Sequence, residues 1–99
     1  MQKDEKTMQE AGETSEKEIV SLLSLDEGER GIFVRAIGGY GLVRRLADMG
    51  LTPGAEVKIV RKCVFGGPVE IEVRGVTIAI GRGIAARIMI KPTKAGTRD

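Results

Sequence analysis

The stretch Arg45-Leu46-Ala47-Asp48-Met49-Gly50-Leu51-Thr52-Pro53-Gly54 decides the fold of this chain. Three apolar residues in and just before it are spaced i, i+4 and i+7, so they share one helical face: Leu42, Leu46 and Met49. Gly50 stands where a left-handed residue ends a helix, and Pro53 comes too soon after it for the helix to resume. A helix of about two turns is not stable alone. We therefore expect the helix over residues 42–49 to pack on neighbouring strands.

Short runs rich in β-branched residues flank this helix and predict strands. In residues 69–74, three β-branched side chains alternate strictly with three charged ones. The predicted strands cover residues 31–37, 55–63, 69–74, 76–80 and 87–91. A short helix between the first and second of five strands predicts an all-β fold, a small SH3-like five-stranded barrel. The OB-fold is the nearest rival, but its helix normally lies later in the chain.

The two ends of the chain differ in composition from its middle. Residues 1–18 carry three lysines against six acidic residues and contain no aromatic or β-branched aliphatic side chain. We expect them to form a disordered acidic tail, and residues 92–99 to form a second, flexible tail. Residues 19–91 are then a single domain. No apolar run reaches the ~18 residues that a bilayer span needs, and the N-terminus has no signal-peptide pattern. These features predict a soluble cytoplasmic protein with no direct membrane insertion.

The composition argues against metal, cofactor and catalytic sites. The chain has no histidine and one cysteine, so we expect no disulfide, metal site or cofactor. Cys63 shares the strand parity of Val57 and Ile59, which predicts a small buried core residue. Glu70 and Glu72 face outward on a predicted strand and do not form a catalytic pair. The sequence therefore predicts no enzymatic activity.

A cluster of glycines precedes the predicted helix, at residues 38, 39 and 41. A glycine-rich turn before a helix can bind phosphate, but Arg44 occupies the position of the third glycine in the dinucleotide fingerprint. We interpret the three glycines as supplying positive φ and close packing at a strand-to-helix corner.

The basic residues of the middle segment do not predict a nucleic-acid partner. They alternate with glutamates on the same predicted faces, and the chain contains only three aromatic side chains. The expected surface is a solvated one of mixed charge. The closing strand over residues 87–91 is expected to be a barrel edge that could pair between copies, so a homo-oligomer is a further possibility.

The apolar residues left over suggest a protein contact. The helix carries more of them than one narrow face needs, and Phe65 falls at a predicted hairpin tip. These residues either cover the mouth of the barrel or form a binding surface beside the arginines. The candidate partner-binding residues are Leu42, Val43, Arg44, Arg45, Leu51 and Phe65.

The order of these motifs resembles the ferrous iron transport protein A (FeoA) family over about residues 22–91. The Arg-Leu-x-x-Met-Gly-Leu-x-Pro-Gly block is the specific element, and the others are glycine-rich turns. The matching segments are Leu25-x-x-Gly28-Glu29-x-Gly31, Ile37-Gly38-Gly39, Arg45 to Gly54, Phe65-Gly66-Gly67-Pro68-Val69, Val73-Arg74-Gly75 and Ala86-x-Ile88. The chain departs from the family at Gly67, where an acidic residue is usual.

The resemblance implies an SH3-like barrel in the bacterial cytoplasm. The expected function is that of an accessory protein of ferrous iron uptake. It implies a partner, the membrane Fe²⁺ transporter FeoB, contacted on its cytoplasmic GTPase domain or its membrane part. The alternative is an SH3-like interaction module related to the C-terminal domain of iron-dependent repressors, which would act in a regulatory complex.

Overall fold

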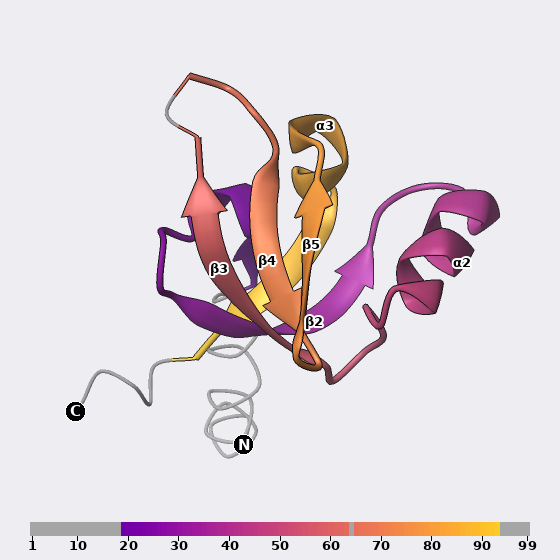
Figure 1. The fold of residues 1–99 in the computed structure, drawn as a ribbon. Coiled ribbons are helices and arrows are strands. Elements are labelled where there is room, and N and C mark those ends of the chain that lie inside the picture. Colours follow the sequence, from indigo (N-terminus) through magenta and orange to yellow (C-terminus); the bar gives the residue numbers. More distant parts are fainter. Residues whose placement is uncertain (1–18, 64, 94–99) are drawn as a thin grey trace, which may run out of the picture.

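The computed structural model describes residues 19–63 and 65–93 (Figure 1). The strands are β1 (Val20–Ser21), β2 (Arg30–Ala36), β3 (Glu56–Lys62), β4 (Val69–Val73), β5 (Val76–Ile80) and β6 (Ile88–Pro92). The helical segments are the 3₁₀ helix η1 (Leu22–Ser24) and the α-helices α2 (Tyr40–Asp48) and α3 (Arg82–Ala85). The predicted N-terminal tail lies outside the described residues. The predicted C-terminal tail began too early, because Pro92 belongs to β6.

The strands form one antiparallel sheet in the order β1-β6-β2-β3-β4-β5. The sheet bends strongly, so that β6 crosses behind β4 and β5 (Figure 1). The prediction of a small all-β, SH3-like fold with a helix between two early strands is confirmed. The apolar segment before residue 26 adds a strand that sequence analysis did not predict, so the described part of the chain has six strands in place of five.

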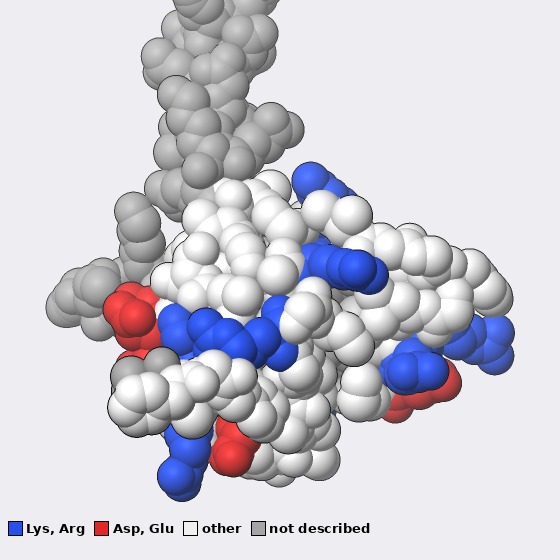
Figure 2. Space-filling view, turned by 90° about the horizontal axis from the view of Figure 1, so that it is seen from above, with Lys and Arg blue, Asp and Glu red and all other residues white. Residues whose placement is uncertain are grey.

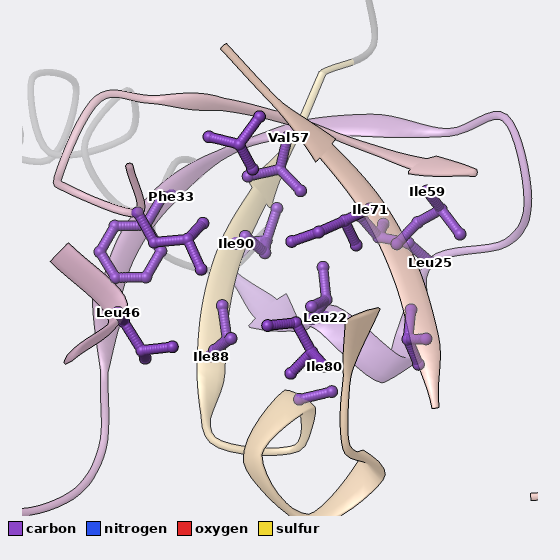
Figure 3. Close-up of a cluster of buried hydrophobic side chains, with 14 of the residues drawn as sticks. Leu22, Leu25, Phe33, Leu46, Val57, Ile59, Ile71, Ile80, Ile88 and Ile90 are labelled. Atoms are coloured by element: carbon purple, nitrogen blue, oxygen red, sulfur yellow. The ribbon is translucent and has the colours of Figure 1, made fainter. Parts of the chain in front are cut away.

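The hydrophobic core lies inside the bend of the sheet (Figure 3). The predicted alternation of β4 is confirmed, because Val69, Ile71 and Val73 are buried while Glu70 and Glu72 are less so. Branched aliphatic side chains from β3, β4 and β6 meet there with Phe33 of β2, and β5 contributes Ile80 at its end. A core of this kind supplies most of the stability of so small a domain.

Helix α2 ends as the sequence predicted. Gly50 has a φ of +98°. Its N–H donates to the carbonyl of Ala47 at 2.9 Å, and the N–H of Leu51 donates to the carbonyl of Leu46 at 2.9 Å. These two bonds define a Schellman motif, in which the residues at both ends of the longer bond are usually apolar and in contact. Leu46 and Leu51 are accordingly both in the core.

A bulge in β3 changes which side chains face inward. The register between β3 and β4 shifts between Ile59 and Arg61, and one extra residue inverts the parity of the strand beyond it. The Nζ of Lys62 therefore turns toward η1 and donates to two backbone carbonyls there, each at 2.8 Å. Cys63 is exposed. The prediction of a buried thiol was wrong because it carried the alternation across the bulge.

The edges of the sheet also differ from the prediction. Of the segment expected to be a free edge, residues 87–91, all but the first lie in β6, which pairs with both β1 and β2. The edges are β1 and β5 instead. Strand β5 is joined to β4 by a two-residue turn, Arg74-Gly75, in which both residues have positive φ. This is the turn conformation that matches the natural twist of a hairpin.

Candidate functional site

The outward face of α2 displays apolar side chains beside an arginine. Ile37 just before the helix is 54% exposed, Tyr40 is 77% exposed and Val43 is 41% exposed. Tyr40 and Val43 are spaced i and i+3, and Arg44 lies four residues after Tyr40, so these side chains are neighbours on the helix surface. The Arg44 Nη1 donates to the Tyr40 hydroxyl at 3.0 Å. We call Ile37, Tyr40, Val43 and Arg44 the α2 surface; Arg45 is also exposed, but it lies two residues after Val43, on another side of the helix.

Two of the predicted contact residues lie in the core or against it. Leu51 is 2% exposed and lies in the core, so it is not available at the surface. Leu42 is half-buried and packs against the core. Val43, Arg44 and Arg45 are exposed as a contact surface requires.

The glycine corner before α2 is held by close packing. A Cβ on Gly38 would lie 2.6 Å from the Leu42 Cδ2, whereas Gly39 and Gly41 have open space around them. None of the three has positive φ. The interpretation of close packing therefore holds for Gly38, and the expectation of positive φ at the corner was wrong. Gly38 thus leaves room for the Leu42 side chain at the strand-to-helix corner.

The β3–β4 loop is a second exposed site. Phe65 is 94% exposed there. Backbone N–H groups of Gly67 and Phe65 hydrogen-bond to the Cys63 sulfur and lower the pKa of its thiol, and the charge of Arg82 acts in the same direction. Donors aimed at a sulfur stabilise the thiolate. The loop thus carries an exposed aromatic ring and a thiol that ionises more readily than an ordinary cysteine.

The structure does not bring Phe65 together with the α2 surface. In Figure 1 the β3–β4 loop stands at the upper left of the sheet and α2 lies at the far right, with β4 and β5 between them. A partner that contacts a single compact patch can use one of these sites and not both. Of the two, the α2 surface combines aliphatic, aromatic and basic side chains, which is the composition typical of the centre of an interface.

The remaining surface is of mixed charge, as predicted. Seen from above, Lys and Arg side chains lie across the molecule with Asp or Glu beside several of them (Figure 2). On the outer face of β2, β3 and β4, Arg30 and Glu56 lie 3.9 Å apart and Arg61 and Glu70 lie 3.8 Å apart. Such exposed pairs contribute little to stability. A shallow hollow of about 450 Å³ on this face is lined by charges of both signs, including Lys58, Glu72 and Arg74.

The described residues contain neither a metal-ligand cluster nor a membrane-spanning helix. Within residues 19–63 and 65–93, no three His, Cys, Asp or Glu side chains lie close enough together to hold a metal ion. In the same part of the chain, no helix is long and apolar enough to cross a membrane. The longest helix in these ranges is α2, with 9 residues.

Comparison with known proteins identifies the family. The model of the FeoA domain matches residues 20–92, which is all of the sheet and its helices. The chain belongs to the FeoA domain family. A relative from Methanocaldococcus jannaschii, which bears the provisional name Fe(2+) transport protein A, is 40% identical over 70 residues, or 71% of this chain and 83% of the relative.

Solved structures agree with the family assignment. A crystal structure described as that of the iron uptake regulatory protein FeoA is 39% identical and superposes with a TM-score of 0.71, covering 76% of this chain and 99% of that one. A manganese-dependent transcriptional repressor is 17% identical with a TM-score of 0.69, and the match covers 76% of this chain and 42% of that one. The second likeness is one of fold alone.

Sequence analysis missed two members of the α2 surface, Ile37 and Tyr40. It began the helix at residue 42, whereas α2 begins at Tyr40 and its N-cap is Gly39. Extending the helical spacing back from Val43 by three residues would have reached Tyr40 and placed it opposite the Leu42, Leu46 and Met49 face. Gly39 without a capping side chain gave no usual start signal for a helix.

Proposed function

We propose that this chain is an accessory protein of ferrous iron uptake that binds the membrane Fe²⁺ transporter FeoB in the cytoplasm. The family membership and the Fe²⁺ transport name of its 40% identical relative support the iron uptake role. The observation that carries the site is the α2 surface, where Ile37, Tyr40 and Val43 are exposed together with Arg44. The protein acts by contact and does not catalyse a reaction.

The chemistry of the α2 surface defines the complement that it requires. Tyr40 and Val43 offer an apolar centre, and Arg44 beside them offers a guanidinium group that binds carboxylates. The complementary patch on the transporter is therefore an apolar depression bordered by acidic side chains. Arg44 is already oriented by its hydrogen bond to the Tyr40 hydroxyl, which reduces the entropy that binding must spend on that side chain.

The test is calorimetric titration of the full chain into the purified cytoplasmic GTPase domain of the transporter. One series contains GDP and the other a non-hydrolysable GTP analogue, because a difference between them measures the coupling between nucleotide and partner. Binding in either state supports the proposal. If neither series produces heat, the titration is repeated with the full-length transporter in detergent, which contains the membrane part as well.

A matched pair of variants tests the site. Val43→Glu places a carboxylate within the α2 surface and is expected to raise the Kd about tenfold or more, which is ~1.4 kcal/mol. Val60→Glu is the control, because Val60 is 39% exposed, nearly the same as the 41% of Val43, but lies on β3. Equal weakening by the two variants, or none by Val43→Glu, would move the contact away from α2.

The alternative function is an SH3-like module in a regulatory complex, as in the repressors whose C-terminal domains this fold resembles. The likeness to the manganese-dependent repressor is at 17% identity and supports the fold only. Binding to the full-length transporter therefore favours the uptake role. Failure to bind it in both nucleotide states would favour the regulatory module.

A further inference from the structure

The two edges of the sheet are protected very differently. Edge strand β1 has two residues, and the chain turns at once into η1, so it offers almost no backbone for pairing. Edge strand β5 has five residues, Val-Thr-Ile-Ala-Ile, with no charge, proline or bulge. Natural proteins use charges, prolines, bulges or short strands to prevent pairing at an edge. β5 has none of these features.

The free side of β5 presents backbone groups in a defined pattern. Val73 and Val76 flank the two-residue turn, and the residues that flank such a turn exchange both of their hydrogen bonds. The alternation along the strand turns the N–H and C=O of Thr77 and Ala79 away from β4. Among the described residues, no backbone hydrogen bond outside the β4–β5 ladder involves β5. Thr77 and Ala79 therefore offer two donors and two acceptors to an incoming strand.

The side chains of β5 also complement a second β5. When two copies pair antiparallel about Ile78, Thr77 of one lies opposite Ala79 of the other, and these are the residues whose backbone groups point outward. On the inner face, Val76 then lies opposite Ile80 and the two Ile78 side chains lie opposite each other. These are the β-branched pairs that stabilise a sheet. Val76, which is 58% exposed in the single chain, would be covered.

Charge and length favour this register. The paired segment is bounded at each end by a glycine, because Gly75 lies opposite Gly81 of the other copy. An uncharged strand is best matched by another uncharged strand, and the nearest acidic side chains, Glu70 and Glu72, lie on β4. In the joined sheet the two β5 strands separate one glutamate row from the other. The two copies are related by a two-fold axis, so each contributes the same residues of β5 to the pair.

We propose that the β5 edge pairs with the β5 edge of a second copy of this chain, which joins two six-stranded sheets into one continuous antiparallel sheet. This association is independent of the transporter contact, because it uses Thr77 and Ala79 and leaves α2 free for another partner. It assigns to β5 the self-pairing that sequence analysis had assigned to residues 87–91.

Proline and lysine substitutions at the edge test the pairing. Ala79→Pro removes an outward N–H that takes no part in the β4–β5 ladder, and Thr77→Lys introduces like charges close together across the two-fold axis. In sedimentation equilibrium up to millimolar concentration, we expect the wild-type chain to show the mass of a dimer and both variants to show the 10.6 kDa of the single chain. Thr93→Lys is the matched control, because Thr93 is equally an exposed threonine but lies beyond β6, and it should leave the dimer intact.

Three results would overturn the proposal. The first is a wild-type chain that stays monomeric at millimolar concentration. The second is a dimer that persists in Thr77→Lys, a variant whose side chain is exposed and whose fold is checked by its circular dichroism. The third is wild-type binding of an unrelated extended peptide at β5 in preference to a second copy, seen as peptide-induced loss of the dimer.

Engineered cysteines test the register. In a Cys63→Ser background, Ile78→Cys places two thiols at a non-hydrogen-bonded pair, where the Cα atoms lie about 4.5 Å apart and a disulfide can form. Thr77→Cys is the control, because the two copies of residue 77 are offset along the strands by two residues. Under mild oxidation the first variant should form a covalent dimer and the second should not. Efficient crosslinking of Thr77→Cys alone would overturn the register centred on Ile78.

Discussion

The end of α2 and the β3–β4 loop have similar sequences, but the apolar side chain beside the glycine is buried in the first and exposed in the second. Both combine large apolar residues with a glycine at a φ close to +97°, Gly50 in the first and Gly66 in the second. After Gly50 the chain enters the core through Leu51, which is 2% exposed, whereas Phe65 beside Gly66 is 94% exposed. A glycine that permits a turn does not decide whether the neighbouring side chain is buried. The Schellman bonds at Gly50 direct the next side chain inward. In the loop the Gly66 N–H donates to the Cys63 carbonyl at 3.3 Å, but no second, longer bond joins the described loop residues.

We call residues 46–51, the end of α2 with its Schellman motif, the anchored region. The largest expected effect comes from placing a charge there. Leu46→Asp puts a carboxylate at a position that is 1% exposed and leaves a cavity as well. We expect the free energy of unfolding to fall by more than about 4 kcal/mol, which is enough to unfold so small a domain at 25 °C. Circular dichroism would show the loss of structure. Arg44→Glu, on the exposed face of the same helix, should change stability by less than about 0.5 kcal/mol. The reverse result for the two variants would mean that α2 is oriented the other way round.

Alanine at the two glycines compares the regions directly. A Cβ at Gly50 would lie 3.3 Å from the Val73 Cγ1, whereas a Cβ at Gly66 would meet nothing within 4 Å. Both substitutions strain the backbone, at a cost of about 1 kcal/mol. Gly50→Ala adds crowding against β4, so we expect a loss of about 2 kcal/mol in chemical denaturation, against about 1 kcal/mol for Gly66→Ala. Equal losses would show that the anchored region relaxes as easily as the loop.

Lys62, at the end of β3 next to the loop, is held by hydrogen bonds to the segment around η1. Its Nζ donates to the carbonyls of Leu23 and Leu25, both at 2.8 Å. Lys62→Met keeps most of the stem and removes the ammonium, so two carbonyls near η1 lose a charged donor. We expect a loss of about 1.5 kcal/mol in the free energy of unfolding. Arg61→Met is the control, because its 3.8 Å ion pair with Glu70 is exposed, and it should cost less than about 0.5 kcal/mol. A loss no larger than that of the control would mean that water replaces the Lys62 contacts.

The sequence predicted the features that arise from local chemistry. The helix stop at Gly50, the alternation of β4 and the turn at Gly75 come from backbone preference and period alone. It did not predict the features that depend on pairing between strands. The bulge in β3 has no sequence signal of its own, so Cys63 was placed inside. The inner position of β6 depends on which strands pair, so the sequence analysis placed the edge of the sheet at the wrong strand. Leu51 was taken for a surface residue because burial beyond the helix end depends on the Schellman geometry.

The last prediction concerns Cys63, where the expected effect on stability is the smallest and the measured effect is on the ionisation of the thiol. Backbone N–H groups of Gly67 and Phe65, and then the charge of Arg82, lower the pKa of its thiol. At any pH below the pKa of an ordinary cysteine, the folded chain therefore carries a larger thiolate fraction than the unfolded chain. We expect the pH profile of alkylation by iodoacetamide to lie at lower pH in the folded protein than in the same protein in denaturant.

The variants separate the causes of this shift. Arg82→Gln should move the profile only part of the way back, because the loop N–H groups act more strongly than the arginine. Phe65→Ala keeps its backbone N–H and should leave the profile unchanged, although it removes an aromatic side chain that is 94% exposed. At the end of α2 the backbone N–H groups of Gly50 and Leu51 close the helix, and in the loop those of Phe65 and Gly67 stabilise a thiolate. A folded profile that coincides with the denatured one would show that the loop N–H groups do not hold the sulfur in solution.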